Sequence, residues 1–160
     1  MKRSSMPTFN HSFQVRAPLR AVADFHRSTH ALKRLTPFPM VAQLHRVDPL
    51  GEGSISEFTL WFGPFPMRWT ARHNHVDALR GFTDEQTSGP LLRWRHKHVF
   101  KAVSGGLTQV NDQIEYQHRP GLRHAWTRLL YSPPMLRVLF AYRAWATRRA
   151  LKNQSPGVVK

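Results

Sequence analysis

The sequence has no cysteine, few acidic residues and no long apolar run. The lack of cysteine excludes disulfides, thiol catalysis and cysteine-ligated zinc. A membrane-spanning helix needs ~20 predominantly apolar residues in a row, and no stretch of the 160 residues comes near that length. The first residues, MKRSSMPTFN, lack the apolar core of a signal peptide. We therefore expect a soluble, cytoplasmic protein.

Basic residues dominate the charge of the chain, since 24 Lys and Arg against 9 Asp and Glu give a net charge of +15. Such a surface attracts nucleic acids, anionic lipids and acidic proteins over long distances. The basic residues are spread along the chain, and no helix-turn-helix, zinc-finger or RNP-like motif is present. We expect no specific nucleic-acid partner. Two interpretations stay open: docking on an anionic membrane surface, or a charge without a functional partner. The membrane interpretation would use Arg123, Arg128, Arg137, Arg148 and Arg149.

Composition and length indicate a globular chain, with 41% hydrophobic and 21% charged residues among 160. We expect a single domain over residues 7–152, with flexible tails at 1–6 and 153–160. A short strand at 9–15 precedes two short helices between Pro18 and Pro37. A long helix follows the pair Pro133-Pro134. Between them, alternating patterns and tight turns predict an antiparallel meander of strands near 40–48, 54–62, 66–76, 79–87, 91–103 and 107–118.

The most informative segment is Gly81 to Phe100, GFTDEQTSGPLLRWRHKHVF, which reads as a hairpin around Ser88-Gly89-Pro90. Successive side chains of a strand point to opposite faces. One face of this hairpin is charged, and it should meet water. The inward face then mixes apolar and polar groups, as a ligand cavity does and a plain core does not. Its members are Phe82, Asp84, Gln86, Leu92, Trp94, His96, His98 and Phe100.

The next hairpin brings a carboxylate to these imidazoles. If Phe100 lies opposite Val110, then His98 faces Asp112 and Asp84 lies diagonal to His96. Three interpretations stay open for this His–Asp cluster: a network that braces the sheet, a site that orients a ligand, or an acid–base pair. For catalysis, the candidate residues are His96, His98, Asp84 and Asp112.

Two histidine pairs have the i, i+2 spacing with which a strand can present two ligands to one metal. They are His73 with His75 and His96 with His98. Hydrogen-bonded cross-strand pairs explain the same spacing. We predict no metal and no cofactor.

On a helical wheel, Met135, Val138, Leu139, Tyr142, Ala146 and Ala150 share one face of the last helix, which we expect to cover the sheet. Arg143 lies on the flank of this face. It would either pair with a ligand carboxylate or with Asp84, or reach water at the edge of the sheet.

The order of strands and helices resembles that of the SRPBCC superfamily, the START-related helix-grip proteins that include the major birch pollen allergen. The segments Phe25 to Pro39, Phe58 to Trp69 and Phe82 to Phe100 look like its bacterial ligand-binding, polyketide cyclase/dehydrase and coenzyme-Q-binding-like branches. The resemblance implies an α+β helix-grip fold, in which a seven-stranded curved antiparallel sheet wraps around the long C-terminal helix. Two short helices lie between its first and second strands.

The implied role is to bind a hydrophobic or aromatic small molecule, such as a lipid, a quinone or a polyketide-like compound, without chemistry. Two alternatives are a cyclase/dehydratase-type enzyme that uses a His–Asp pair, and a basic membrane-surface carrier of lipid or quinone. Oligomeric state is left open. The predicted ligand-binding residues are Phe58, Leu60, Phe62, Trp69, His73, Phe82, Asp84, Gln86, Trp94, His96, His98, Ile114, Tyr116, Leu139, Tyr142 and Arg143.

Overall fold

The computed structural model describes residues 6–28 and 30–154, apart from the side chains of Arg123 and Gln154. Most of the two predicted tails therefore lies outside the described residues. The strands are β1 (Thr8–Arg16), β2 (Met40–Val47), β3 (Ile55–Phe62), β4 (Phe65–Asp77), β5 (Gly81–Ser88), β6 (Arg93–Ala102) and β7 (Leu107–Gln117). The helices are α1 (Leu19–Arg27), α2 (Ala31–Arg34), α3 (Ala125–Leu130) and α4 (Pro133–Leu151), with short 3-10 turns η1 (Leu122–His124) and η2 (Lys152–Gln154).

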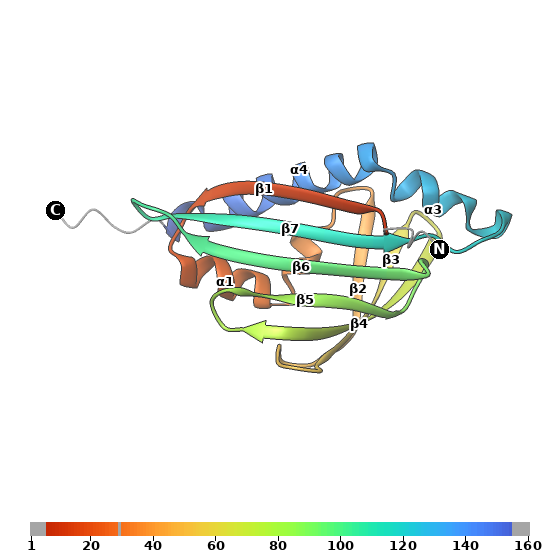
Figure 1. Ribbon diagram of the computed structural model, residues 1–160, viewed down its shortest axis with the longest axis horizontal. Helices are drawn as coiled ribbons and strands as arrows, with labels where there is room; N and C mark the ends of the chain where they lie inside the picture. The colour runs from red at the N-terminus through yellow and green to blue at the C-terminus, as the bar shows by residue number, and fades with distance from the viewer. Residues whose placement is uncertain (1–5, 29, 155–160) are drawn as a thin grey trace, which may run out of the picture.

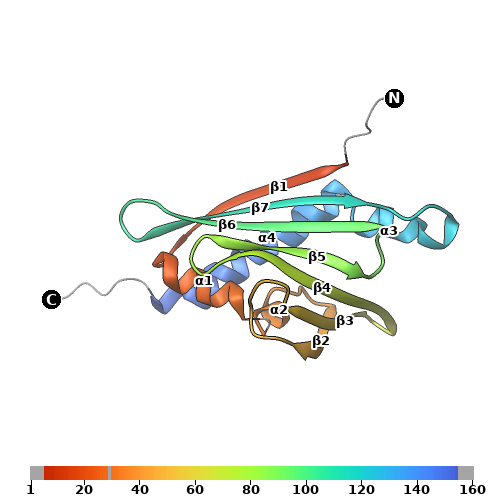
Figure 2. The same ribbon diagram turned by 60° about the horizontal axis from the view of Figure 1, so that its bottom comes forward.

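The seven strands form one antiparallel sheet in the order β1-β7-β6-β5-β4-β3-β2. The long helix α4 runs lengthwise along one face of this sheet (Figure 1). At the far edge of the sheet, β2 and β3 lie beside α2 (Figure 2). The predicted α+β helix-grip arrangement is thus confirmed. Among the described residues, no helix is long and apolar enough to cross a membrane.

The register of the last hairpin matches the sequence prediction. Phe100 pairs with Val110 and His98 with Asp112. The prediction for Asp84 was wrong, because Asp84 lies directly opposite His96 and not diagonal to it. The strands approach closely here, since a Cβ on Gly81, which has a φ of +129°, would overlap the carbonyl of His98.

The prediction that Leu92 points inward was also wrong. Strand β6 begins only at Arg93, and Leu92 is exposed while Leu91 is fully buried. The side chain of Gln86 explains this change. Its amide nitrogen donates to the carbonyl of Leu91 at 2.8 Å, and its oxygen accepts from the Leu91 N–H at 3.4 Å. These bonds prolong the turn and shift the buried position by one residue.

Helix α4 buries a different face from the one predicted. The face against the sheet consists of Leu136, Phe140, Ala144, Thr147 and Leu151, at spacings of three and four residues. In contrast, Met135 and Val138, which belong to the predicted stripe, are exposed. Both sides of the helix carry apolar residues, so the helical wheel is compatible with either side being buried. Only tertiary packing determines which side faces the sheet. Ala146 and Tyr142 of the predicted stripe pack against α2 instead.

The substitution Phe140→Ala should destabilise the fold by about 3–5 kcal/mol, because it leaves a cavity in the core. The Phe140 ring is 1% exposed and lies 5.5 Å from the ring of Phe9 and 5.4 Å from that of His96, between centroids. Urea unfolding measures the change. Val138→Ala, at an exposed position of the same helix, is the control and should stay within about 0.5 kcal/mol of wild type. Equal effects of the two substitutions would contradict this placement of α4.

Candidate functional site

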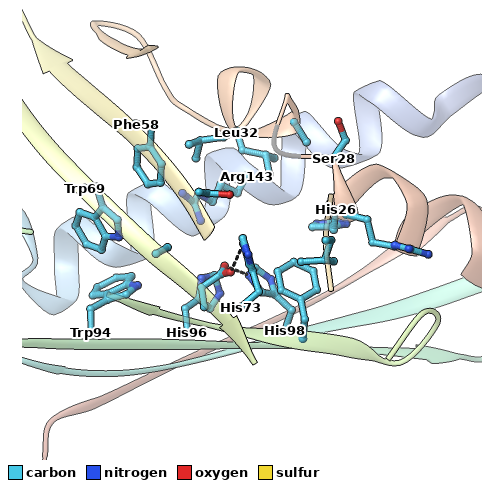
Figure 3. Close-up of a pocket in the computed structure, with 18 of the residues that line it drawn as sticks. His26, Ser28, Leu32, Phe58, Trp69, His73, Trp94, His96, His98 and Arg143 are labelled. Carbon is cyan, nitrogen blue, oxygen red and sulfur yellow. Dashed lines mark hydrogen bonds and ion pairs between the residues drawn. The ribbon is translucent and has the colours of Figure 1, made fainter. Parts of the chain in front are cut away.

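A cavity of about 160 Å³ lies between the sheet, α4 and the segment that joins α1 to α2. Figure 3 shows aromatic rings at one end of this cavity and imidazoles along its sheet side. Eleven of the sixteen predicted ligand-binding residues line it. They are Phe58, Leu60, Trp69, His73, Phe82, Asp84, Trp94, His96, His98, Leu139 and Arg143.

The other five predicted residues lie outside the cavity lining. Phe62 is at the end of β3 and is exposed. Gln86 holds the β5–β6 turn, as described above. The Tyr142 hydroxyl donates to the carbonyl of Arg34 on α2 at 3.3 Å. Ile114 and Tyr116 lie on the inward face of β7, as predicted, but they pack with Phe9, Leu136 and Phe140 in the core.

The sequence did not predict the cavity residues that the first two helices, α1 and α2, contribute. His26, Arg27, Ser28, Ala31, Leu32 and Leu35 line the cavity from α1, α2 and their junction. No pattern in the sequence indicates that these helices turn toward β6. By contrast, Ser56 and Ala71 also line the cavity and could have been found, because each lies two residues from a predicted member of the same strand face.

The polar part of the cavity is a His–Asp network that spans four adjacent strands. His96 on β6 donates from Nε2 to Asp112 Oδ1 on β7 at 2.8 Å. His98 donates from Nε2 to Asp84 Oδ2 on β5 at 3.0 Å, and its Nδ1 lies 3.2 Å from Asp112 Oδ1. The network continues to β4, where His73 Nε2 lies 3.1 Å from Asp84 Oδ1 (Figure 3).

The network separates the pKa values of neighbouring imidazoles. Burial by itself would lower the pKa of His98, but the hydrogen bonds with Asp112 and Asp84 outweigh burial and raise that pKa to about 9. For His96, burial and the charge on His98 lower the pKa to about 4 despite the bond to Asp112. The two rings are 3.8 Å apart between centroids. At neutral pH, a protonated and a neutral imidazole therefore lie side by side.

The two carboxylates remain ionised inside the protein. Burial would raise the pKa of Asp84, yet His73 and His98 hold it well below the usual range. Likewise, burial opposes ionisation of Asp112, and bonds from His96 and His98 hold its pKa far below normal. Both carboxylates are thus engaged by imidazoles of the sheet.

Arg143 projects from α4 and lines the cavity, where it is half-buried. Its Nε is buried without a hydrogen bond, and its guanidinium lies 5.2 Å from the centroid of the Phe140 ring. Burial lowers the pKa of Arg143, although Asp112 and Asp84 counteract the shift from a distance. None of the ion pairs formed among the described residues includes Arg143. The rotation of α4 relative to the predicted wheel accounts for this position.

Three donors of the network lie close enough together to hold a metal ion. One ligand atom each from Asp84, His96 and His98 lies within 4.8 Å of the others. A metal would have to displace the proton from His98, whose pKa the two carboxylates raise. The pair His73 and His75 does not converge, because His75 has a φ of 52° at an irregularity of β4 and is exposed. The donors favour an ion-pair network over a metal site.

Comparison with known proteins identifies the architecture. No family model and no curated protein matches the chain. Solved structures do match: a protein from Chromobacterium violaceum has a TM-score of 0.74 at 12% identity, covering 94% of this chain and 99% of that one. An aromatase/cyclase from Streptomyces sp. R1128 has 0.65 at 16%, covering 94% and 93%. Norcoclaurine synthase from Thalictrum flavum has 0.67 at 15%, covering 95% and 90%.

The chain has the helix-grip fold of these solved structures. Structural similarity at such low sequence identity shows the fold only, so any activity has to be argued from the residues of the site.

The stability of the protein should be greatest near pH 6.5 and fall on both sides. Between pH 6.5 and about 9, folded His98 keeps a proton that the unfolded chain releases, so the free energy of unfolding falls as pH rises. Between pH 6.5 and about 4, the unfolded chain binds protons that buried His26 and His96 do not bind, so the free energy of unfolding falls as pH drops.

Urea unfolding at a series of pH values measures both limbs, and NMR of the imidazole nitrogens assigns the protons. In His98→Gln, the alkaline limb should become shallower, whereas His45→Gln, at an exposed position of β2, should leave it unchanged. Titration of His98 near its usual value would contradict the network described above.

Proposed function

We propose that the protein binds a single-ring aromatic molecule with a carboxylate or similar anionic end. The observation that carries this proposal is a cavity with aromatic walls that also contains the guanidinium of Arg143 outside any described ion pair. The aromatic walls supply most of the binding free energy through burial of apolar area. Arg143 then selects the charge of the ligand.

The size of the cavity supports a small ligand. An apolar cavity of ~150 Å³ accommodates benzene, and the cavity here measures about 160 Å³. Lipid tails and multi-ring polyketides occupy more space than this, so among the ligands expected from the sequence we favour one ring with a short substituent.

The aromatic walls are arranged to hold a ring. Phe58 and Trp69 are nearly parallel, at 11° and 6.1 Å between centroids. Trp94 meets Trp69 edge to face at 5.7 Å and 90°. Such offset and perpendicular arrangements are those that aromatic groups prefer, and a ligand ring would extend them.

The hydrogen bonds of the network support an anionic ligand. Asp84 and Asp112 are already bound by His73, His96 and His98, of which His98 is protonated and His96 is neutral at pH 7. Arg143 adds a further positive charge from the helix side. Burying a charge without a partner is costly, and a ligand carboxylate would supply the partner with a charge-assisted hydrogen bond.

A structural relative also supports the class of ligand. The norcoclaurine synthase structure from Thalictrum flavum contains dopamine and hydroxybenzaldehyde, which are one-ring aromatic compounds. That observation belongs to the plant protein, and it indicates that a helix-grip cavity is able to accept molecules of this size.

Arg143→Met should weaken the binding of phenylacetate by about tenfold to a hundredfold, because it removes a charge-assisted hydrogen bond. The binding of phenylacetamide, the neutral counterpart, should change little. Isothermal titration calorimetry measures both affinities. Arg137→Met, at an exposed position of the same helix, makes the same change in net charge and is the control.

Loss of affinity in the control variant would show that net charge alone attracts the ligand. Equal binding of phenylacetate to wild type and to Arg143→Met would contradict the role of the guanidinium. Absence of binding for phenylacetate, phenylacetamide and toluene alike would contradict the whole proposal.

A second candidate function is acid–base catalysis on the same ligand class. One observation favours it: His96 and His98 are adjacent and have pKa values shifted in opposite directions. Environments that separate the pKa values of neighbouring groups are typical of acid–base pairs. Neutral His96, oriented by Asp112, would accept a proton, and protonated His98 would stabilise the negative charge that develops.

If this second candidate is correct, the protein should accelerate deuterium exchange at the acetyl group of 4-acetylbenzoate by about a hundredfold or more. The measurement is proton NMR in deuterium oxide, relative to buffer alone. His96→Gln should remove the acceleration while phenylacetate still binds, and His45→Gln should retain it. If wild type exchanges deuterium no faster than buffer alone, the acid–base candidate is wrong and only the binding proposal stands.

A further inference from the structure

Large apolar side chains are exposed at one end of the molecule, which we call the apolar end. In both views, α3, the β3–β4 turn and the β5–β6 turn lie toward the end of the molecule opposite the last turn of α4 (Figures 1 and 2). Backbone bonds connect part of this surface, since the Leu92 N–H donates to the carbonyl of Gln117 shortly before η1. The apolar end consists of Phe62, Phe65, Leu92, Leu122, Trp126 and Leu129.

Three of these six side chains protrude strongly, the other three are about half exposed, and none of the six lines the cavity between the sheet and α4. Leu122 is 94% exposed, Leu129 is 74% exposed and Phe65 is 69% exposed. A rigid protein partner needs a complementary surface, whereas isolated protruding side chains can each enter a deformable apolar phase. Several exposed apolar side chains toward one end of a molecule support an interaction site there. Trp126 adds the residue type that prefers membrane–water interfaces.

The segment that follows β7 carries charge of a single sign. No acidic residue follows Glu115 in the sequence, so η1, α3 and α4 carry only basic charges. Arg128 is exposed beside Leu129 on α3, and Arg137 is exposed at the beginning of α4. Basic residues flanking exposed apolar ones are typical of segments that bind anionic lipid surfaces.

We infer that the apolar end docks on an anionic lipid bilayer. The side chains of the turns and of α3 enter the boundary between head groups and acyl chains, and Arg128 and Arg137 contact anionic head groups. Each apolar group buried in the bilayer adds to the affinity, and each arginine near an anionic surface contributes further. Pairing of two copies through the same end would bring together two surfaces of like charge on chains of +15. The inference is independent of the ligand proposed for the cavity.

The test is co-sedimentation of the full chain with vesicles of phosphatidylcholine alone or mixed with phosphatidylglycerol. Wild type should sediment with the mixed vesicles only, and high salt should weaken that binding. The double variant Leu122→Ser with Leu129→Ser should reduce the partition coefficient at least about tenfold. Both positions are exposed in the free protein, so the fold should persist, which circular dichroism checks.

A matched control changes two exposed apolar residues at the opposite end of the sheet. Leu79 lies in the β4–β5 turn and Val103 in the β6–β7 turn, and both are exposed. Leu79→Ser with Val103→Ser should bind mixed vesicles like wild type. Tryptophan fluorescence adds a local readout: the emission should shift to shorter wavelength on binding, and Trp126→Phe should remove most of that shift.

Three results would overturn the inference. Equal vesicle binding by the two double variants would show that charge alone drives association. Absence of vesicle binding together with a dimer in analytical ultracentrifugation, lost in the Leu122 and Leu129 variant, would assign the surface to a second copy. Absence of vesicle binding together with apolar-end-dependent binding to an acidic polypeptide would assign it to a protein partner.

Discussion

One buried and one half-buried carboxylate, with the imidazoles that surround them, constrain most of this structure. Ionised Asp112 and Asp84 are tolerated here because His73, His96 and His98 bind them at hydrogen-bonding distance. Those five groups come from four neighbouring strands, so the sheet must keep its register and curvature for every charge to find its partner. The cavity lies beside this network, between the sheet, α4 and the segment that joins α1 to α2.

The sequence predicted the sheet well, because strand periodicity and short turns leave little freedom. The alternation of β6 and β7 and the tight turn between them were enough to place His98 opposite Asp112. The same reasoning identified most of the strand residues that line the cavity. It failed at Leu92, where a side-chain bond from Gln86 lengthens the turn by a residue and no periodic pattern indicates such a bond.

The helices were predicted less well, and the reason is also physical. On α4, Met135 and Val138 are as apolar as Leu136 and Phe140, so composition alone could not decide which face is buried. The choice of face determines where Arg143 points. After β1 the chain returns over the sheet, and the path it takes determines which residues of α1 and α2 line the cavity. That path depends on long-range packing, which no local sequence pattern encodes.

The alternation of β6 has a consequence for how the chain reaches its native state. Its inward residues include the imidazoles of His96 and His98, and its outward neighbours include the charged Arg95 and Lys97. A slip of one residue during strand pairing exchanges the two faces. It would carry cations into the interior and leave Asp112 without its histidine partners. Folding intermediates in which β6 pairs in a shifted register are therefore strongly disfavoured. The polar groups of the cavity thus also help to select the native register of the sheet.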